Sequence, residues 1–102
     1  MIIFNTTYCL DQSVLQSGLL WLKENYIPKA LASGQIHTPR LSKILSNETE
    51  GANYSLQFMV ESIDILEIWY QSTGDDLSQE MNQRFGEKML GFSTLLEEVP
   101  LT

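Results

Sequence analysis

The hydrophobic and polar residues of this chain follow two patterns, one of alternation and one with helical spacing. Alternation is clearest at 54–60, where Tyr54, Leu56, Phe58 and Val60 share one face of an extended chain. Residues 2–9 are rich in β-branched and aromatic types, which favours a first strand. Two further strands are predicted over 36–46 and 90–99. The segments between the first and second strands, and between the third and fourth, have helical spacing.

The first predicted helix follows Asp11 and Ser13, which supply side chains suited to cap its first turn. Its apolar stripe consists of Val14, Leu15, Leu19, Leu22 and Tyr26. Pro28 lacks an amide hydrogen and disfavours a helical residue before it, so we expect a kink or break near Ile27.

The second predicted helix begins at Ser62 and is followed by a further helix that Gly86 ends. Thr73 and Gly74 are expected to interrupt the helical segment, and Asp75 suits the start of the helix that follows. The residues predicted on the buried side of the first part are Ile63, Leu66, Trp69 and Tyr70.

The order of these elements is β-α-β-β-α-β, with a hairpin formed by 36–46, an acidic turn at 47–53, and 54–60. Two right-handed crossovers around a hairpin predict an α+β fold, the ferredoxin-like plait. We expect a single domain over 1–102, with a four-stranded antiparallel sheet and both helices on one face. The first and third strands should lie in the middle, and Pro39 marks the second strand as an edge.

The face of the sheet turned away from the helices is predicted to be mixed in character. Its central residues should be Ile3, Asn5, Thr7, Ser55, Gln57 and Met59. One solution for such a face is a twofold homodimer, which would make a dimeric α/β barrel. The alternative is a monomer whose open face is solvated, as antiparallel sheets often are.

Composition and charge narrow the classes of partner. The chain has 102 residues, with 13 Asp and Glu against 6 Lys and Arg, and a net charge of −7. Such an acidic protein repels phosphate backbones, so we expect no nucleic-acid binding. Its apolar runs are too short to span a membrane, no signal peptide is recognised, and its single Cys9 has no partner for a disulfide. We therefore expect a cytoplasmic protein.

Candidate binding residues come from the open face and the edge strand. The side chains of Asn5, Thr7, Ser55 and Gln57 could orient a small ligand in a dimer cavity, or they could bond to each other, to a partner chain or to water. His37 and Arg40 belong to a basic cluster with Lys29 and Lys43 that could bind an anion. Strict alternation places His37 and Lys43 on one side of the strand and Arg40 on the other.

Six segments together resemble the bacterial domain-of-unknown-function family 4286. They are MIIFNTT at 1–7, YIP at 26–28, PRL at 39–41, YSLQF at 54–58, RFGEK at 84–88 and TLLE at 94–97. The resemblance covers nearly the whole chain and implies a short cytosolic protein without an assigned activity. The layout is also similar to the dimeric α/β-barrel group, which includes cofactor-independent monooxygenases, haem-degrading enzymes and isomerases.

This second likeness leaves the choice between enzyme and binding protein open. Asn5 with Trp69 is similar to the Asn and Trp of the haem-degrading and quinone-forming enzymes, but residues 71–88 lack the histidine that haem would need. A lone His37 does not make a metal site either, so we expect no cofactor and no metal. Three hypotheses remain: a homodimer that binds a small molecule, a cofactor-independent monooxygenase or isomerase, and a protein-interaction module.

Overall fold

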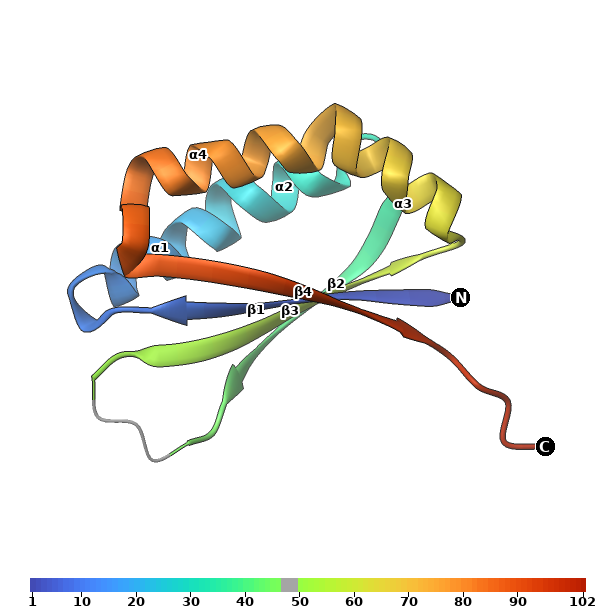
Figure 1. Cartoon of the computed structure of the whole chain (residues 1–102), viewed down its shortest axis with the longest axis horizontal. Coiled ribbons are helices and arrows are strands. Elements are labelled where there is room, and N and C mark those ends of the chain that lie inside the picture. The colour runs from blue at the N-terminus through green and yellow to red at the C-terminus, as the bar shows by residue number, and fades with distance from the viewer. Residues whose placement is uncertain (47–49) are drawn as a thin grey trace.

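The structure, a computed structural model, describes residues 1–46 and 50–102. It consists of a twisted antiparallel sheet with all of its helices on one face (Figure 1). The ferredoxin-like plait predicted from the order of the elements is confirmed.

Four strands of nine residues each form the sheet, in the order β2-β3-β1-β4. Their bounds are Ile2–Leu10 for β1, Ile36–Ile44 for β2, Ala52–Val60 for β3 and Met89–Glu97 for β4. β1 and β3 lie in the middle, and β2 is an edge strand, as Pro39 indicated. β2 ends two residues before its predicted end and β3 begins two residues before its predicted start, so the connection expected at 47–53 is displaced to 45–51 with the same length. Its residues 47–49 lie outside the described part of the chain.

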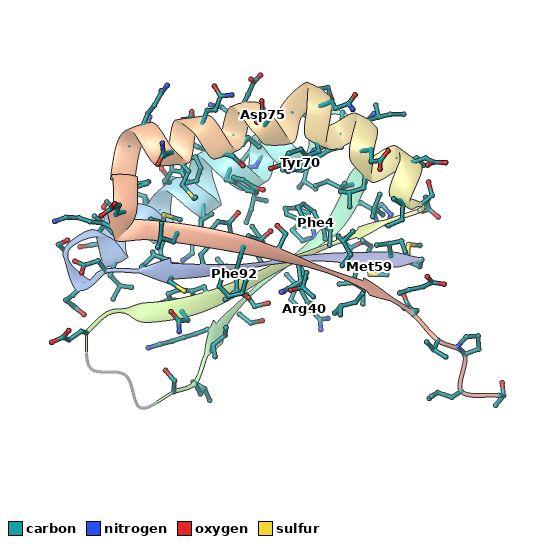
Figure 2. The ribbon with its side chains drawn as sticks, viewed as in Figure 1. Phe4, Arg40, Met59, Tyr70, Asp75 and Phe92 are labelled. Carbon is teal, nitrogen blue, oxygen red and sulfur yellow. The ribbon has the colours of Figure 1, made fainter. Side chains whose placement is uncertain are left out.

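The two faces of the sheet differ in what covers them. In β1 every second residue is buried from Ile2 to Leu10, because those side chains meet the helices. Figure 2 shows Phe4 and Tyr70 between the sheet and the helices, and Arg40 and Phe92 on the opposite side. Among the described residues no helix covers that opposite face.

The first helical segment is continuous, so there is no break near Ile27, and the irregularity at this place is a π-helical turn that ends at Tyr26. α1 (Leu15–Trp21) passes into a π-helical turn, Leu22–Tyr26, and then into α2 (Ile27–Leu31). In this wider turn the amide of Ile27 donates to the carbonyl of Leu22, five residues earlier. Pro28 follows just where the chain returns to α-helical spacing, and it has no amide hydrogen that needs a partner.

The second helical segment has the same construction: the interruption predicted at Thr73 and Gly74 is a π-helical turn and not a break in the chain's helical course, and the next α-helix begins at Asp75 as predicted. α3 (Ile63–Trp69), a π-helical turn at Tyr70–Gly74 and α4 (Asp75–Phe85) follow one another without a break. A Cβ atom on Gly74 would lie 2.6 Å from the ring of Trp69. Glycine is therefore required at this position by the packing of Trp69 and not by a turn.

Aromatic residues join the two helical segments above the sheet. Trp69 is fully buried, and its Nε1 donates to the carbonyl oxygen of Ala30 at 2.9 Å. Its ring also meets Phe4 of β1 edge-on at 5.5 Å between centroids. On the other side, Glu80 of α4 accepts from Trp21 Nε1 at 3.2 Å and from Lys29 Nζ at 3.1 Å. These contacts fix the two helical segments side by side.

A β-bulge in β2 changes the face on which its basic residues lie. His37 stands opposite Met59 and Arg40 opposite Gln57, so one extra residue of β2 is taken up between them. Both side chains therefore lie on the uncovered face, whereas Lys43 stands opposite Tyr54 on the other. The prediction that His37 and Lys43 lie on the same side of the strand, with Arg40 on the other, is wrong because the bulge breaks the alternation.

None of the helices in the described part of the chain is both long enough and apolar enough to cross a membrane.

Candidate functional site

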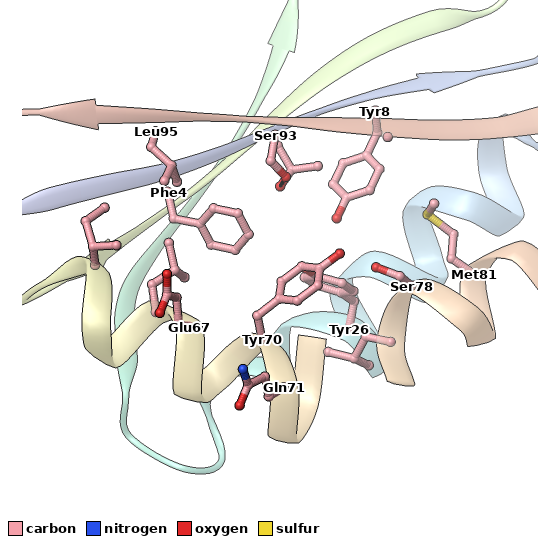
Figure 3. Close-up of a pocket in the computed structure, with 15 residues that line it drawn as sticks. Phe4, Tyr8, Tyr26, Glu67, Tyr70, Gln71, Ser78, Met81, Ser93 and Leu95 are labelled. Carbon is pink, nitrogen blue, oxygen red and sulfur yellow. Dashed lines mark hydrogen bonds between the residues drawn. The ribbon is translucent and has the colours of Figure 1, made fainter. Parts of the chain in front are cut away.

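A cavity of about 800 Å³ lies between the sheet and the second helical segment. Its walls come from β1 and β4 on one side, from α3 and α4 on the other, and from Tyr26 of the first helical segment (Figure 3). The buried residues that form its floor are Phe4, Thr6, Tyr8, Tyr26, Leu66 and Leu77. Exposed residues form its rim, namely Ile63, Glu67, Tyr70, Gln71, Ser78, Ser93 and Leu95.

The sheet side of the cavity follows directly from strand alternation. Phe4, Thr6 and Tyr8 are every second residue of β1, and all three point to the helices. Their partners in β4 are Leu95, Ser93 and Gly91, which share the same face. The hydroxyl groups of Thr6 and Ser93 lie 3.1 Å apart and share a hydrogen bond. The cavity thus has a pair of hydroxyl groups between apolar and aromatic side chains.

Gly91 makes room for the ring of Tyr8. A Cβ atom on Gly91 would lie 2.9 Å from the ring of Tyr8, which is closer than packed atoms approach. The missing side chain lets this ring lie against the backbone of β4. Gly91 therefore permits the position that the ring of Tyr8 takes in the cavity.

The other two tyrosines of the cavity belong to the π-helical turns. Tyr26 ends the first of these turns and Tyr70 begins the second. Turns of this kind interrupt α-helices rarely and are frequent at functional sites. Figure 3 shows the hydroxyls of Tyr8 and Tyr70 pointing toward one another, with Ser78 beside them. Three aromatic hydroxyls from three separate elements therefore meet at one cavity.

Burial controls the protonation of the two inner tyrosines. Burial, together with the neighbouring Tyr26, raises the pKa of Tyr8 well above its ordinary value. Burial likewise raises the pKa of Tyr26. At neutral pH both phenols are therefore uncharged and can donate or accept hydrogen bonds. Among the described residues that line the cavity, Glu67 is the carboxylate, and none is Lys, Arg or His.

The four polar residues predicted on the open face are brought together there. Ser55 Oγ donates a hydrogen bond to Asn5 Oδ1 at 2.5 Å, and Asn5 Nδ2 donates one to Thr7 Oγ1 at 3.5 Å. Gln57 stands opposite Asn5 in the register of β1 and β3. Asn5, Thr7 and Ser55 thus bond to each other within one subunit. Their role toward a ligand or a second chain remains a prediction.

The basic cluster predicted from the sequence is divided by the fold. His37 lies at the edge, where Nδ1 is 2.8 Å from Thr38 Oγ1 and Nε2 is 3.3 Å from Glu61 Oε1. Lys29 is instead held by Glu80 on the helical layer, and this Lys29 contact holds the pKa of Glu80 below its usual range. His37 and Arg40 share the open face with the four polar residues, and none of these six lines the cavity.

The open face also carries large exposed apolar side chains, mainly from β4. Leu90, Phe92 and Leu96 stand opposite Cys9, Thr7 and Ile3 of β1, so they share the uncovered face. Phe92 is 59% exposed. Cys9 is half-buried here as a free thiol.

Comparison with known proteins places the chain in a family. The model of the domain of unknown function DUF4286 matches residues 1–99. The chain belongs to DUF4286. None of the curated proteins matches this DUF4286 chain. Among solved structures, a dimeric ferredoxin-like protein from an uncultured marine organism is similar, with 12% identity and a TM-score of 0.63. The match covers 100% of both chains, and at this identity it shows the fold alone.

Sequence reasoning missed the cavity of this DUF4286 chain. Tyr26 and Tyr70 have helical spacing with apolar neighbours, so they were predicted as core. Tyr70 is 46% exposed and Ile63 is 41% exposed, which makes the prediction of buried positions wrong for both. Tyr70 and Ile63 line the cavity across from β4, and the open cavity leaves their side chains exposed. The signal in the sequence is a tyrosine, in place of phenylalanine, at the inward positions 8, 26 and 70, because a tyrosine hydroxyl needs a polar or open surrounding.

Proposed function

We propose that this DUF4286 chain is a cytoplasmic homodimer, of which each subunit binds one small molecule in its own cavity. The cavity is the observation that carries the proposal. A volume of about 800 Å³ falls within the range of known ligand sites, and such sites combine apolar walls with a few polar groups. Phe4, Leu66 and Leu77 supply apolar walls, while Thr6 and Tyr8 supply hydroxyls.

The position of the proposed ligand differs from the position expected from the sequence. The expected site lay between two sheets, around Asn5 and Gln57. The cavity lies on the other side of the same strands, so β1 would serve both functions. Its odd-numbered residues would face the second subunit, and Phe4, Thr6 and Tyr8 would face the ligand.

The uncovered sheet face supports the dimer. Phe92 and its apolar neighbours on β4 lose contact with water if a second copy covers them. A twofold axis would bring the same surface of both subunits together. The similar marine protein is described as dimeric, which supports a dimer without indicating its contact surface.

A screen by thermal shift tests the ligand. We expect metabolite-like compounds that raise the melting temperature of the wild type but not of Ser78→Trp, in which an indole enters the rim. Asn82→Trp is the matched control, because Asn82 is an exposed residue of the same helix outside the cavity lining. Compounds that stabilise all three proteins equally would place the ligand elsewhere, and a screen without any hit would contradict ligand binding.

Sedimentation equilibrium tests the dimer independently. We expect a dimer at micromolar concentration whether or not a ligand is present. A wild-type monomer under these conditions would contradict the homodimer and leave the result of the ligand screen unaffected.

A further inference from the structure

We propose that the ligand is an organic cation, with an apolar or aromatic body on the floor of the cavity and an ammonium group at the rim beside Glu67. This inference rests on the proposed function, because it names the chemical class of the molecule that the cavity binds. Charge and aromatic surface support it separately.

The charge of the cavity favours a cation. Glu67 lies on α3 at the exposed rim, and in Figure 3 its side chain rises from the helix toward Phe4. The described lining residues include no basic side chain that would oppose a bound ammonium group. The net charge of −7 also raises the local concentration of cations around the protein.

The aromatic residues of the cavity suit the same ligand. Phe4, Tyr8, Tyr26 and Tyr70 all line it, from β1 and from both helical segments. The electron-rich faces of such rings attract ammonium groups, and groups of aromatic side chains are a known means of recognising organic amines. The hydroxyls of Tyr70 and Ser78 lie farther along the helical segment, beside Tyr8, and can hydrogen-bond to a second polar group of the ligand (Figure 3).

An anion is disfavoured by the same residues. A carboxylate or phosphate in this cavity would lose water without meeting a positive charge, and it would lie near Glu67. The inner phenols of Tyr8 and Tyr26 are neutral and supply hydrogen bonds but no charge. A neutral ligand could use the floor and donate a hydrogen bond to the carboxylate, but it would form neither an ion pair nor a cation–π contact.

Three probes with one phenyl body and different head groups test the inference. They are 2-phenylethylamine, 2-phenylethanol and 3-phenylpropionate, measured by ligand-observed NMR titration at neutral pH. We expect the amine to bind about tenfold more tightly than the alcohol, because an ion pair at a rim and a cation–π contact each contribute modestly. The propionate should bind most weakly. Equal binding of amine and alcohol, or tighter binding of the propionate, would overturn the inference.

Glu67→Gln separates the carboxylate from the rest of the cavity. We expect this variant to lose most of the preference for the amine over the alcohol while its affinity for the alcohol stays within about twofold. Asp64→Asn is the matched control, because it removes the same charge from an exposed residue of α3 outside the cavity lining. An equal loss in both variants would mean that only the net charge matters, and would overturn the role of Glu67.

The probes also distinguish this inference from the proposed function. If the thermal-shift screen finds neutral or acidic compounds that Ser78→Trp blocks, and the amine shows no preference, the cation is wrong and the binding site stands. If neither the probes nor the screen gives any binding, both proposals are wrong.

Discussion

The two edge strands of the sheet, β2 and β4, are built in opposite ways. β2 contains Pro39, a bulge and the cations Arg40 and Lys43, and Thr38 in the bulge has a φ of 55°. β4 has neither a proline nor a charged residue from position 89 to position 96.

The difference shows which edge is protected against association. Proline, bulges and positive charges keep an edge strand from pairing with another chain, and β2 has all three. β4 has none of them over eight residues and exposes Leu90, Phe92, Leu95 and Leu96. The proposed contact with a second copy is therefore expected to centre on β4 and the adjoining open face, and not on β2.

The largest expected effect is that of a charge on the open face of β4. Phe92→Lys should weaken the dimer more than about a hundredfold, because two symmetry-related ammonium groups would be buried unpaired. Ser42→Lys is the control, since it places the same charge on the open face of β2, where Ser42 stands opposite Ser55. Sedimentation equilibrium measures both. A stronger effect of Ser42→Lys would reverse the comparison.

A smaller effect is expected at the centre of the sheet. Gln57→Lys should weaken the dimer about tenfold, because the long lysine stem can carry its charge toward the edge at β2. Thr94→Lys is the matched change on β4, since both Gln57 and Thr94 stand opposite Asn5, on either side of it. We expect Thr94→Lys to weaken the dimer more. The reverse order in the same sedimentation assay would place the interface nearer β2.

The other face of β4 gives a test of stability. Gly91→Ala should reduce the free energy of unfolding by about 1 kcal/mol, because overpacking against Tyr8 outweighs the entropy advantage of alanine. Ser42→Ala is the control, because Ser42 stands opposite Ser55 on the face of the sheet turned away from Tyr8. Urea denaturation monitored by circular dichroism measures both, and a stabilised Gly91→Ala would mean that Tyr8 is not held against this glycine.

The smallest effect concerns the bulge of β2. Thr38→Asn should raise the free energy of unfolding by about 0.5 kcal/mol, because asparagine adopts a positive φ more readily than a β-branched residue does. Ser42→Asn, at a regular position of the same strand, should give no gain. A loss of stability in Thr38→Asn would show that the threonine contributes more than the strain costs.

The sequence predicted the strands better than it predicted the helices. In β1 and β3 the period of two residues alone was enough to assign the core face and the open face, because neither strand contains a bulge. In β2 the alternation failed after His37, since the extra residue beside Pro39 reverses the faces. Proline indicated an irregular edge but not how many residues the irregularity would take up.

The interruptions of the helices are predicted from Pro28 and from Thr73 and Gly74, and the structure has π-helical turns at or next to these residues where the prediction expects breaks. Buried residues five apart, Trp21 with Tyr26 and Trp69 with Gly74, are the trace that a π-helical turn leaves in the sequence. The cavity was beyond reach for a different reason. It depends on how far each side chain fills the space between two layers, and residue types alone do not determine this.

The two π-helical turns give this architecture tolerance to changes in length. A turn that closes over five residues holds one residue more than an α-helical turn. Deletion of one residue within Leu22–Tyr26 or Tyr70–Gly74 would therefore restore regular helix, and the flanking stretches would keep their faces toward the sheet. Each deletion would at the same time re-aim Tyr26 or Tyr70 in the cavity. Insertions and deletions, which buried helices usually reject, would thus offer this chain a route by which the shape of the cavity, and with it the proposed ligand preference, can change while the fold is retained.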